Sequence, residues 1–259
     1  MLKRTFMHLP RVGPATELHL WRQGLQTWDD LLAARRVPGV SPSRLARHQR
    51  HLEESLAHLD QPAYFSRRLP AAERWRLFDQ YRPRTAYLDI ETTGANWPHL
   101  TVTVIGLYDG RDFQQFVLGQ NLQDFLAHID AYPVLVTFNG SQFDLPVLEA
   151  VFGRPFPQAH IDLRFVLARL GYKGGLKKIE PRFGLQRPAD LEGLDGYDAV
   201  LLWERARRGD AAALETLLAY NREDVINLET LMEQAYQLAR QRTLAQIASA
   251  DPHFNSSQK

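Results

Sequence analysis

The chain has 259 residues, which is enough for one large domain or two smaller ones. Apolar residues make up 44% and charged residues 24%, close to the average of globular proteins, so the composition argues against a disordered chain. The absence of cysteine excludes a disulfide framework, a Cys-ligated zinc site and a thiol nucleophile. No apolar run approaches the roughly 18 residues of a membrane span, and no signal-peptide core is found, so we expect a soluble, cytoplasmic protein with no membrane partner.

The net charge of +1 hides an asymmetry along the chain. Residues 1–86 carry 15 Lys and Arg against 8 Asp and Glu, whereas residues 87–259 carry 16 against 22. This pattern suggests that the first part attracts a polyanion while the second concentrates carboxylates. A solvated basic helix surface is the simpler explanation of the first part.

Residues 1–82 have the pattern of a helical segment. Apolar residues recur at helical spacing after Pro14, and Thr27 is a good N-cap for a short helix through Leu32. A third helix is expected after a Ser cap near residue 41, with leucines at near-helical spacing from residue 45 to 59.

From about residue 85 the pattern changes to short β-rich runs. They cover residues 85–90, 100–108, 111–119, 132–139 and 158–163, and the last long helix is expected at about 210–242. Three consecutive strands followed by alternating helices and strands predict an α/β fold, a mixed sheet flanked by helices. We therefore expect a basic helical segment at 1–82, an α/β domain at 83–245 and a frayed tail at 246–259.

The first group of candidate functional residues is Asp89 and Glu91, at the end of an apolar run that stops at Gly94. Residues two apart in a strand project from the same face, so both carboxylates would point to one side. Two adjacent like charges are costly unless a cation lies between them, and oxygen ligands suit Mg²⁺ or Mn²⁺. Alone, this short motif is also explained by a solvated turn.

Two further groups follow along the chain. Asn139 ends an apolar run, and Asp144 falls in the first turn of a helix expected from about residue 141, where the helix dipole favours a carboxylate. Tyr220 and Asp224 lie one turn apart and so share a helix face. Taken separately, each of these residues has an ordinary structural explanation.

Taken together, Asp89-x-Glu91, Asn139-x-x-x-Phe143-Asp144 and Tyr220-x-x-x-Asp224 resemble the DEDD superfamily of 3′–5′ exonucleases, which have the ribonuclease H-like fold. The Tyr four residues before the last Asp is typical of the DEDDy branch; the DEDDh branch would need a His where this chain has Ala219. The flanking sequences look most similar to the prokaryotic YprB-type family. The resemblance covers about residues 85–240.

The resemblance implies a mechanism with two divalent cations, Mg²⁺ or Mn²⁺. Asp89 would bridge the ions, Glu91 and Asp224 would complete one site, and Asp144 would hold the other. One ion would activate water and the other would stabilise the leaving 3′ oxygen. Tyr220 would orient the attacking water, because a phenol with an ordinary pKa near 10 is a poor base.

Substrate-binding residues are also implied. Thr92, Thr93 and Gly94 would lie beside the terminal nucleotide, and Asn139 of the second motif would also contact the substrate. In addition, Lys177 follows two glycines that could place a helix start near a phosphate, although a glycine-closed helix with solvated lysines explains that pattern as well.

Other residues give weaker signals. Asp162 is expected either to form hydrogen bonds that orient the metal-binding residues or to be a helix N-cap. His160 is expected to be structural, Phe143 to pack in the core more often than to stack on a base, and Phe116 and Trp97 give no functional signal.

Residues 8–32 loosely resemble a helix-hairpin-helix module, which binds DNA phosphates through backbone amides. Only Gly13 is present where two glycines are typical, and Arg11 occupies a hairpin position, so a purely structural helical cap is the alternative.

The sequence therefore predicts a metal-dependent 3′–5′ exonuclease acting on DNA or RNA, with single-stranded nucleic acid or frayed 3′ ends as its partner. The alternatives are a ribonuclease H-type endonuclease, which a long basic groove would favour, and a non-catalytic nucleic-acid-binding module.

Overall fold

The computed structural model of the chain describes residues 1–94 and 100–250, and these form two compact units. One unit comprises residues 1–82 together with the described residues from Tyr236 onward, and the other comprises Pro83–Ala235. Every residue that the sequence predicts to carry chemistry belongs to the second unit. Trp97 and the tail from residue 251 lie outside the described residues.

The first unit is helical, as predicted. Its elements before the second unit begins are η1 (Leu2–Arg4), α1 (Pro14–Arg22), α2 (Trp28–Ala33), α3 (Pro42–Ala57), α4 (Pro62–Ser66), η2 (Ala71–Leu77) and α5 (Phe78–Tyr81), with η3 (Arg82–Arg84) at the boundary. The predicted caps are present. Ser41 caps α3, and Thr27 caps α2 in a capping box, in which its amide donates to the Asp30 carboxylate over 2.7 Å.

Buried aromatic and charged side chains hold this unit together. The rings of Trp28, His8 and Phe65 pack against one another, with centroid distances from Trp28 of 5.0 Å to His8 and 5.8 Å to Phe65. Glu17 and Arg76, both almost fully buried, form an ion pair of 3.0 Å. The proposed hairpin before α1 follows η1 rather than a longer helix, and Arg11 there has a positive φ of 61°. Contact between this segment and DNA stays a prediction.

The second unit alternates strands and helices. Its elements are β1 (Thr85–Thr92), β2 (Val102–Tyr108), β3 (Phe113–Val117), η4 (Leu122–Asp124), α6 (Phe125–Ile129), β4 (Val134–Thr137), α7 (Asp144–Phe152), β5 (Ala159–Asp162), α8 (Leu163–Arg169), α9 (Leu176–Ile179), η5 (Glu180–Phe183), α10 (Gly196–Ala206) and the first part of α11 (Ala211–Ala250). Four of the five predicted β-rich runs contain one strand each, and β1 begins with the run 85–90 but continues two residues further, to Thr92.

The five strands form one mixed sheet in the order β3-β2-β1-β4-β5. β1 pairs antiparallel with β2, and β2 with β3, whereas β1–β4 and β4–β5 are parallel. This is the predicted arrangement of three antiparallel strands followed by parallel ones, flanked by helices. β1 lies at the centre, so side chains at its C-terminal end are enclosed on both sides.

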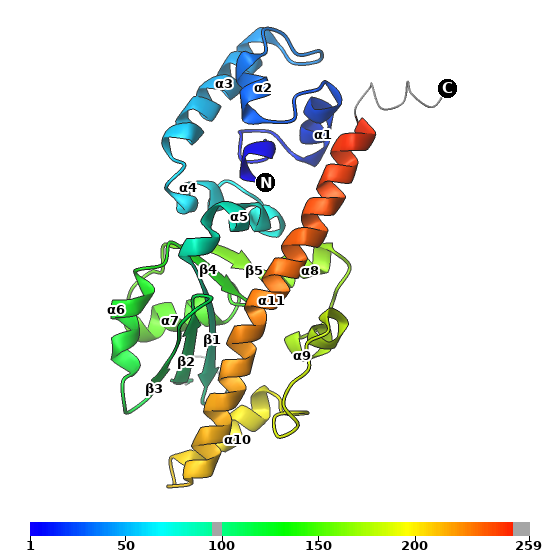
Figure 1. Cartoon of the computed structure of the whole chain (residues 1–259). Helices are drawn as coiled ribbons and strands as arrows, with labels where there is room; N and C mark the ends of the chain where they lie inside the picture. The colour runs from blue at the N-terminus through cyan, green and yellow to red at the C-terminus, as the bar shows by residue number, and fades with distance from the viewer. Residues whose placement is uncertain (95–99, 251–259) are drawn as a thin grey trace. The chain divides into compact units, whose positions relative to one another are not determined.

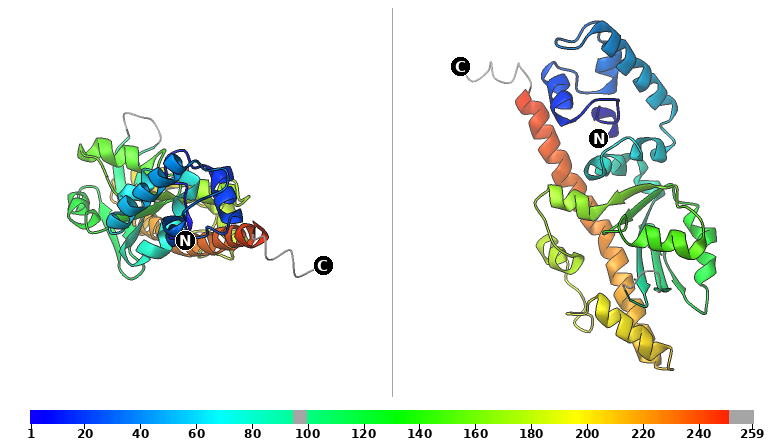
Figure 2. Two further views of the ribbon diagram at one scale, coloured as in Figure 1. Left: turned by 90° about the horizontal axis from the view of Figure 1, so that it is seen from above. Right: turned by 180° about the vertical axis from the view of Figure 1, so that it is seen from behind.

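Helices cover both faces of the sheet. On one face, Leu88 and Ile90 of β1 pack with Phe125 of α6 and Leu148 of α7 in a buried apolar cluster. On the other face, α10 and α11 pack over β2, with Leu217 and Tyr220 of α11 in the same cluster as Val104. Figure 1 looks onto the face that carries α11, and the reverse view in Figure 2 shows the face that carries α6 and α7.

Two helix boundaries differ from the predictions. α7 begins at Asp144 rather than near residue 141, because Asn139 has a positive φ of 69° and a turn occupies residues 141–143. α11 continues to Ala250, past the expected end at 242 and into the expected tail, since no Gly or Pro interrupts the chain between Asp210 and Pro252. α11 therefore contributes to both units. Within residues 1–94 and 100–250, no helix is long and apolar enough to span a membrane.

Candidate active site

Two carboxylates of the candidate site project from the central strand toward α11. Leu88 and Ile90 face the apolar cluster under α7, so the alternating Asp89 and Glu91 face the opposite side. Glu91 is buried at 7% exposure, and Asp89 is half-buried. The strand pairing shifts between Glu91 and Thr92, where a bulge ends the regular ladder.

Asn221 of α11 fixes the position of Asp89. Its side-chain amide donates to the Asp89 carbonyl oxygen over 3.4 Å and to Asp89 Oδ2 over 3.3 Å. Asn221 is fully buried, and its Oδ1 accepts from Gln115 of β3 over 3.3 Å. The register pairs Asp89 with Gly106 of β2, and a Cβ at Gly106 would come 2.7 Å from Val225 of α11. The missing side chain at Gly106 is therefore what lets α11 approach the strand so closely.

α11 adds the third carboxylate. Carboxylate oxygens of Asp89, Glu91 and Asp224 lie within 4.8 Å of one another, which is a spacing that one metal ion could span. Tyr220, one turn earlier on the same helix face, is 3% exposed and lines the same pocket. The structure thus brings together the predicted residues of the first and third motifs.

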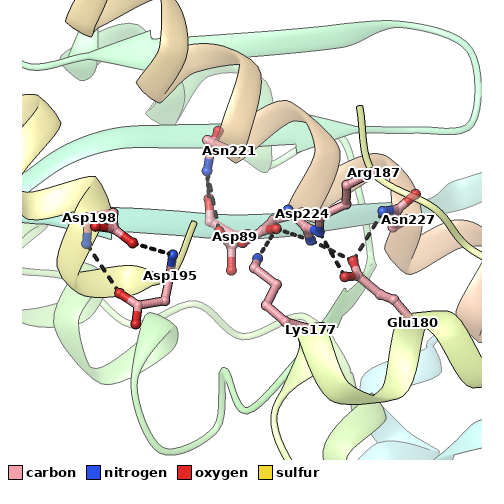
Figure 3. Close-up of polar contacts among 9 residues, drawn as sticks. All are labelled: Asp89, Lys177, Glu180, Arg187, Asp195, Asp198, Asn221, Asp224 and Asn227. Carbon is pink, nitrogen blue, oxygen red and sulfur yellow. Dashed lines mark hydrogen bonds and ion pairs between the residues drawn. The ribbon is translucent and has the colours of Figure 1, made fainter. Parts of the chain in front are cut away.

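Two basic side chains contact Asp224, as Figure 3 shows. Lys177 Nζ and Arg187 Nη2 both donate to Asp224 Oδ1. Arg187 is in turn held by Glu180 through bonds of 2.8 and 2.6 Å, and Asn227 donates to Glu180 over 3.1 Å. Burial opposes the charged form of Arg187, but the hydrogen bonds and charges of Glu180 and Asp224 outweigh it and raise its pKa.

Lys177 was predicted from the sequence as a phosphate contact, and the structure places its ammonium on a carboxylate and 4.3 Å from the Tyr220 ring centroid. Arg187 and Glu180 were not foreseen. They lie on segments without regular strands, and their spacing of seven residues gives no signal in the sequence.

Asp144 approaches the same pocket from the start of α7 but lies outside the three-carboxylate cluster. It is 3% exposed, and its Oδ1 is buried without a hydrogen-bond partner in the described part of the chain. A buried carboxylate oxygen without a donor is costly, so this atom is suited to a ligand that the pocket receives.

The electrostatics of the pocket are those of crowded, buried carboxylates. Burial raises the pKa of Glu91 to about 8, with the charge of Asp224 adding to the effect. Burial also raises the pKa of Asp144 to about 7 and that of Asp89 well above its usual value, where Asp224 is the strongest charged neighbour. Burial together with the charge of Asp224 raises the pKa of the Tyr220 phenol.

This donor set fits hard divalent cations. The ligand atoms are all carboxylate oxygens, the charges repel one another, and Oδ1 of Asp144 is buried with no hydrogen-bond partner among the described residues. The carboxylates of Asp89, Glu91 and Asp224 would hold one ion.

The pocket around these groups has a volume of about 400 Å³. Thr92, Gly94 and Asn139, predicted as substrate contacts, line it, whereas Thr93 does not. Its rim includes Tyr197, which is 70% exposed at the start of α10.

Tyr197 was missed by the sequence analysis. A capping box between Asp195 and Asp198, both drawn in Figure 3, begins α10 and sets the backbone position of Tyr197, whose amide donates to the Asp195 carboxylate. The Asp-Gly-Tyr-Asp sequence carries the cap signal, but only the packing of α10 beside β1 shows that the ring belongs to the site.

Asp162 supports the loop before α7. Its carboxylate accepts from the amide of Asn139 over 2.8 Å and from the amide and hydroxyl of Ser141 over 3.1 and 2.6 Å, and it also caps α8. His160 is buried and its ring shares a hydrogen bond of 2.8 Å with Thr137. Phe143 packs against the apolar cluster and also lines the pocket.

A mixed sheet with antiparallel and then parallel strands, with clustered carboxylates on its central strand and on a covering helix, defines a ribonuclease H-like nuclease fold. The chain belongs to the RNase H superfamily, whose family model matches residues 86–236. No curated protein matches the chain.

The chain is similar to the family B DNA polymerase from the hyperthermophilic archaeon Pyrobaculum calidifontis, with 20% identity and a TM-score of 0.48 over 58% of this chain and 24% of that chain. It is also similar to Brucella melitensis NrnC with bound Mg²⁺, with 24% identity and a TM-score of 0.44 over 67% of this chain and 83% of that one. For Brucella melitensis NrnC bound to pGG, the identity is 22% and the TM-score is 0.43 over 67% of this chain and 82% of that chain. The chain thus spans about a quarter of the polymerase.

Proposed function

We propose that the chain is a 3′–5′ exonuclease that hydrolyses phosphodiester bonds of single-stranded DNA or RNA with two divalent cations, Mg²⁺ or Mn²⁺. The order of motifs, ending in Tyr220-x-x-x-Asp224, supports a DEDDy-type enzyme of the YprB-like group. The direction of digestion rests on this resemblance.

One observation carries the proposal: three carboxylates from β1 and α11 lie within 4.8 Å of one another in a pocket that also holds Asp144 and Tyr220. Carboxylates brought this close without a cation destabilise the fold, so their clustering is a feature of a site that binds one. The volume of about 400 Å³ suits a small ligand such as a terminal nucleotide.

Bound divalent cations would neutralise charge on the phosphate and lower the pKa of water. The chain supplies the remaining functions. Asn221 holds Asp89 in position, and Tyr220, whose raised pKa keeps it protonated, offers a hydroxyl that orients the attacking water. Tyr197 offers an exposed ring at the rim on which a terminal base can stack, a contact worth about 1–3 kcal/mol in single-strand binding.

The test uses short DNA and RNA strands labelled at either end, with Mg²⁺ or Mn²⁺. We expect single nucleotides to be released from 3′-labelled strands, while 5′-labelled strands shorten one nucleotide at a time. Asp89→Asn and Asp224→Asn should abolish this activity, and Asp190→Asn, an exposed carboxylate that lines none of the pockets described, should not. Internal fragments in the first time points would instead indicate an endonuclease, and metal-independent binding without cleavage would indicate a non-catalytic module.

The rim contact is tested separately. Tyr197→Ala should raise KM several-fold with little effect on folding. Leu201→Ala removes another exposed apolar side chain, at 44% exposure, from the same helix and serves as the matched control. Equal KM values in the two variants would remove Tyr197 from the substrate site.

For the helical segment 1–82 we propose a supporting role in nucleic-acid affinity, on the basis of its basic excess. Each phosphate neutralised on a single strand adds about 0.7 to the salt slope of binding. Charge-removing changes at Arg11 and Arg22, both exposed, should therefore flatten the slope and raise KM more than they lower kcat. An unchanged slope in folded variants would leave the segment a structural cap.

A further inference from the structure

A second cavity adjoins the carboxylate pocket. It has a volume of about 560 Å³ and shares two wall residues, Phe138 and Asn139, with that pocket. Its other side chains include Arg164, Tyr172 and Lys173. The two cavities are opposite in charge, because among the described residues the first is lined by four carboxylates and the second by two cations and no carboxylate.

The two cations of this second cavity have no carboxylate partner in the part of the chain that the structure describes. Arg164 and Lys173 are exposed, and neither forms an ion pair with any carboxylate among the described residues. Arg164 is nevertheless held in place, since its Nη1 donates to the side-chain oxygens of Asn139 and Gln142, the latter over 2.8 Å. Among the described residues its Nε and Nη2 have no hydrogen-bond partner, so the guanidinium is held at the wall between the cavities with these donors facing no protein acceptor there.

Hydrogen bonds to a buried carboxylate hold the segment that forms the wall between the two cavities. The buried carboxylate of Asp162 accepts from the backbone amides of Asn139 and Arg164, at 2.8 and 3.1 Å, and from Ser141. Asn139 has a positive φ of 69°, a conformation that is sparsely populated for residues other than glycine and is common at functional sites. One buried carboxylate therefore sets the position of the residue that divides the two cavities and of the arginine beside it.

We propose that this second cavity, the Arg164–Lys173 subsite, binds the phosphate that lies one nucleotide to the 5′ side of the scissile bond. The proposal rests on the proposed exonuclease function and assigns the direction in which the strand runs across the site. The terminal nucleotide contributes only the scissile phosphate, which lies at the carboxylate pocket. The remaining strand carries the other phosphates, and these need cations. The cationic cavity is therefore on the side of the continuing strand, and the rim with Tyr197 is on the side of the leaving nucleotide.

The experiment removes the charge either from the phosphate of the strand or from the two basic side chains of the subsite. A single neutral methylphosphonate replaces the phosphodiester next to the scissile one, or the linkage two positions further, in a short 3′-labelled strand. The variants are Lys173→Gln and Arg164→Gln, singly and together, and Arg111→Gln, an exposed cation in the β2–β3 turn, is the control. The readouts are KM, kcat and the salt slope of KM, with thermal unfolding as the check on folding.

We expect the neutral linkage next to the scissile bond to raise the wild-type KM about tenfold, the loss of one charge-assisted hydrogen bond, and to leave kcat within about twofold. In the double variant the same replacement should have almost no further effect, because the charge it removes no longer has a partner. Lys173→Gln alone, at an exposed position that cannot perturb the fold, should show part of the effect. The distant neutral linkage and Arg111→Gln should change KM little.

Two results would overturn the proposal. If the strand is shortened normally but the neutral linkage raises KM by the same factor in the double variant as in the wild-type protein, the subsite lies elsewhere and the exonuclease function stands. If the wild-type protein releases no 3′ nucleotides from any strand, the proposed function fails and the subsite fails with it.

Discussion

Replacing Gly106 by Ala tests whether the close approach of α11 to β2 positions the site. Gly106 pairs with Asp89 across the sheet, and an added Cβ would lie 2.7 Å from Val225 and still closer to Asn221 Oδ1. Real Cβ atoms do not approach side chains this closely, so α11 or the Asn221 side chain must move. Asn221 is the residue that donates to Asp89, so the movement reaches the carboxylate cluster.

The magnitude follows from two opposing effects. Overpacking a well-packed site costs about 1–3 kcal/mol. Removing a strand glycine gains about 0.5–1 kcal/mol of backbone entropy. We expect a net loss of about 1–2 kcal/mol, which lowers Tm by roughly 2–8 °C for a domain of this size.

Thermal unfolding and calorimetric Mn²⁺ titration measure both consequences. Gly106→Ala should lower Tm and weaken Mn²⁺ binding together. Gly196→Ala, where a Cβ meets nothing within 4 Å, is the control for stability and should leave Tm unchanged or slightly higher. A Gly106→Ala protein with wild-type Tm and wild-type Mn²⁺ affinity would refute the argument that the missing side chain sets this contact.

Three further predictions concern the pocket. In metal-free protein the pKa values of Glu91 and Asp144, raised to about 8 and 7, mean that the folded state holds protons that the unfolded state releases. The free energy of unfolding should therefore fall as pH rises from about 5 to 8, by up to about 1.4 kcal/mol per pH unit for each group. Mg²⁺ should make this dependence on pH shallower. Urea titrations with and without Mg²⁺ measure the free energy, and a value that rises with pH would contradict the prediction. Tyr220→Phe should lower single-turnover rates about 10²–10⁴-fold with little change in substrate affinity, and a wild-type rate would make Tyr220 a packing residue. Lys177→Met should tighten Mn²⁺ binding several-fold in calorimetry, because the ammonium repels the ion and occupies an Asp224 oxygen; weaker binding would show that the lysine supports the metal site.

The parts of the fold that could be predicted depend on local patterns. Apolar runs located all five strands, and the two-residue spacing of Asp89 and Glu91 correctly placed both on one face of β1. The one-turn spacing of Tyr220 and Asp224 likewise placed both in one pocket. Each of these inferences needs only the periodicity of a single element.

What the sequence could not show depends on contacts between distant segments. The Arg187–Glu180 pair beside Asp224 comes from η5 and the chain that follows it, whose path has no periodic signal. The Tyr197 ring comes from the start of α10, and its place at the pocket rim depends on how that helix packs. Gly106 did carry a signal, since a glycine within a strand often marks a close approach. The identity of its neighbour, Asn221, follows only from the docking of α11.

The hydrogen bond between Asn221 and Asp89 joins residues 132 positions apart in the chain. Contacts of such long range form late, because the chain entropy of closing the loop is lost before the contact is made. During synthesis β1 emerges long before α11, so the carboxylate cluster cannot assemble until residue 224 has been added and its helix has docked. A chain interrupted anywhere between β5 and α11 has only two of the three clustered carboxylates. The carboxylate cluster is thus completed when α11 docks rather than gradually as the sheet forms.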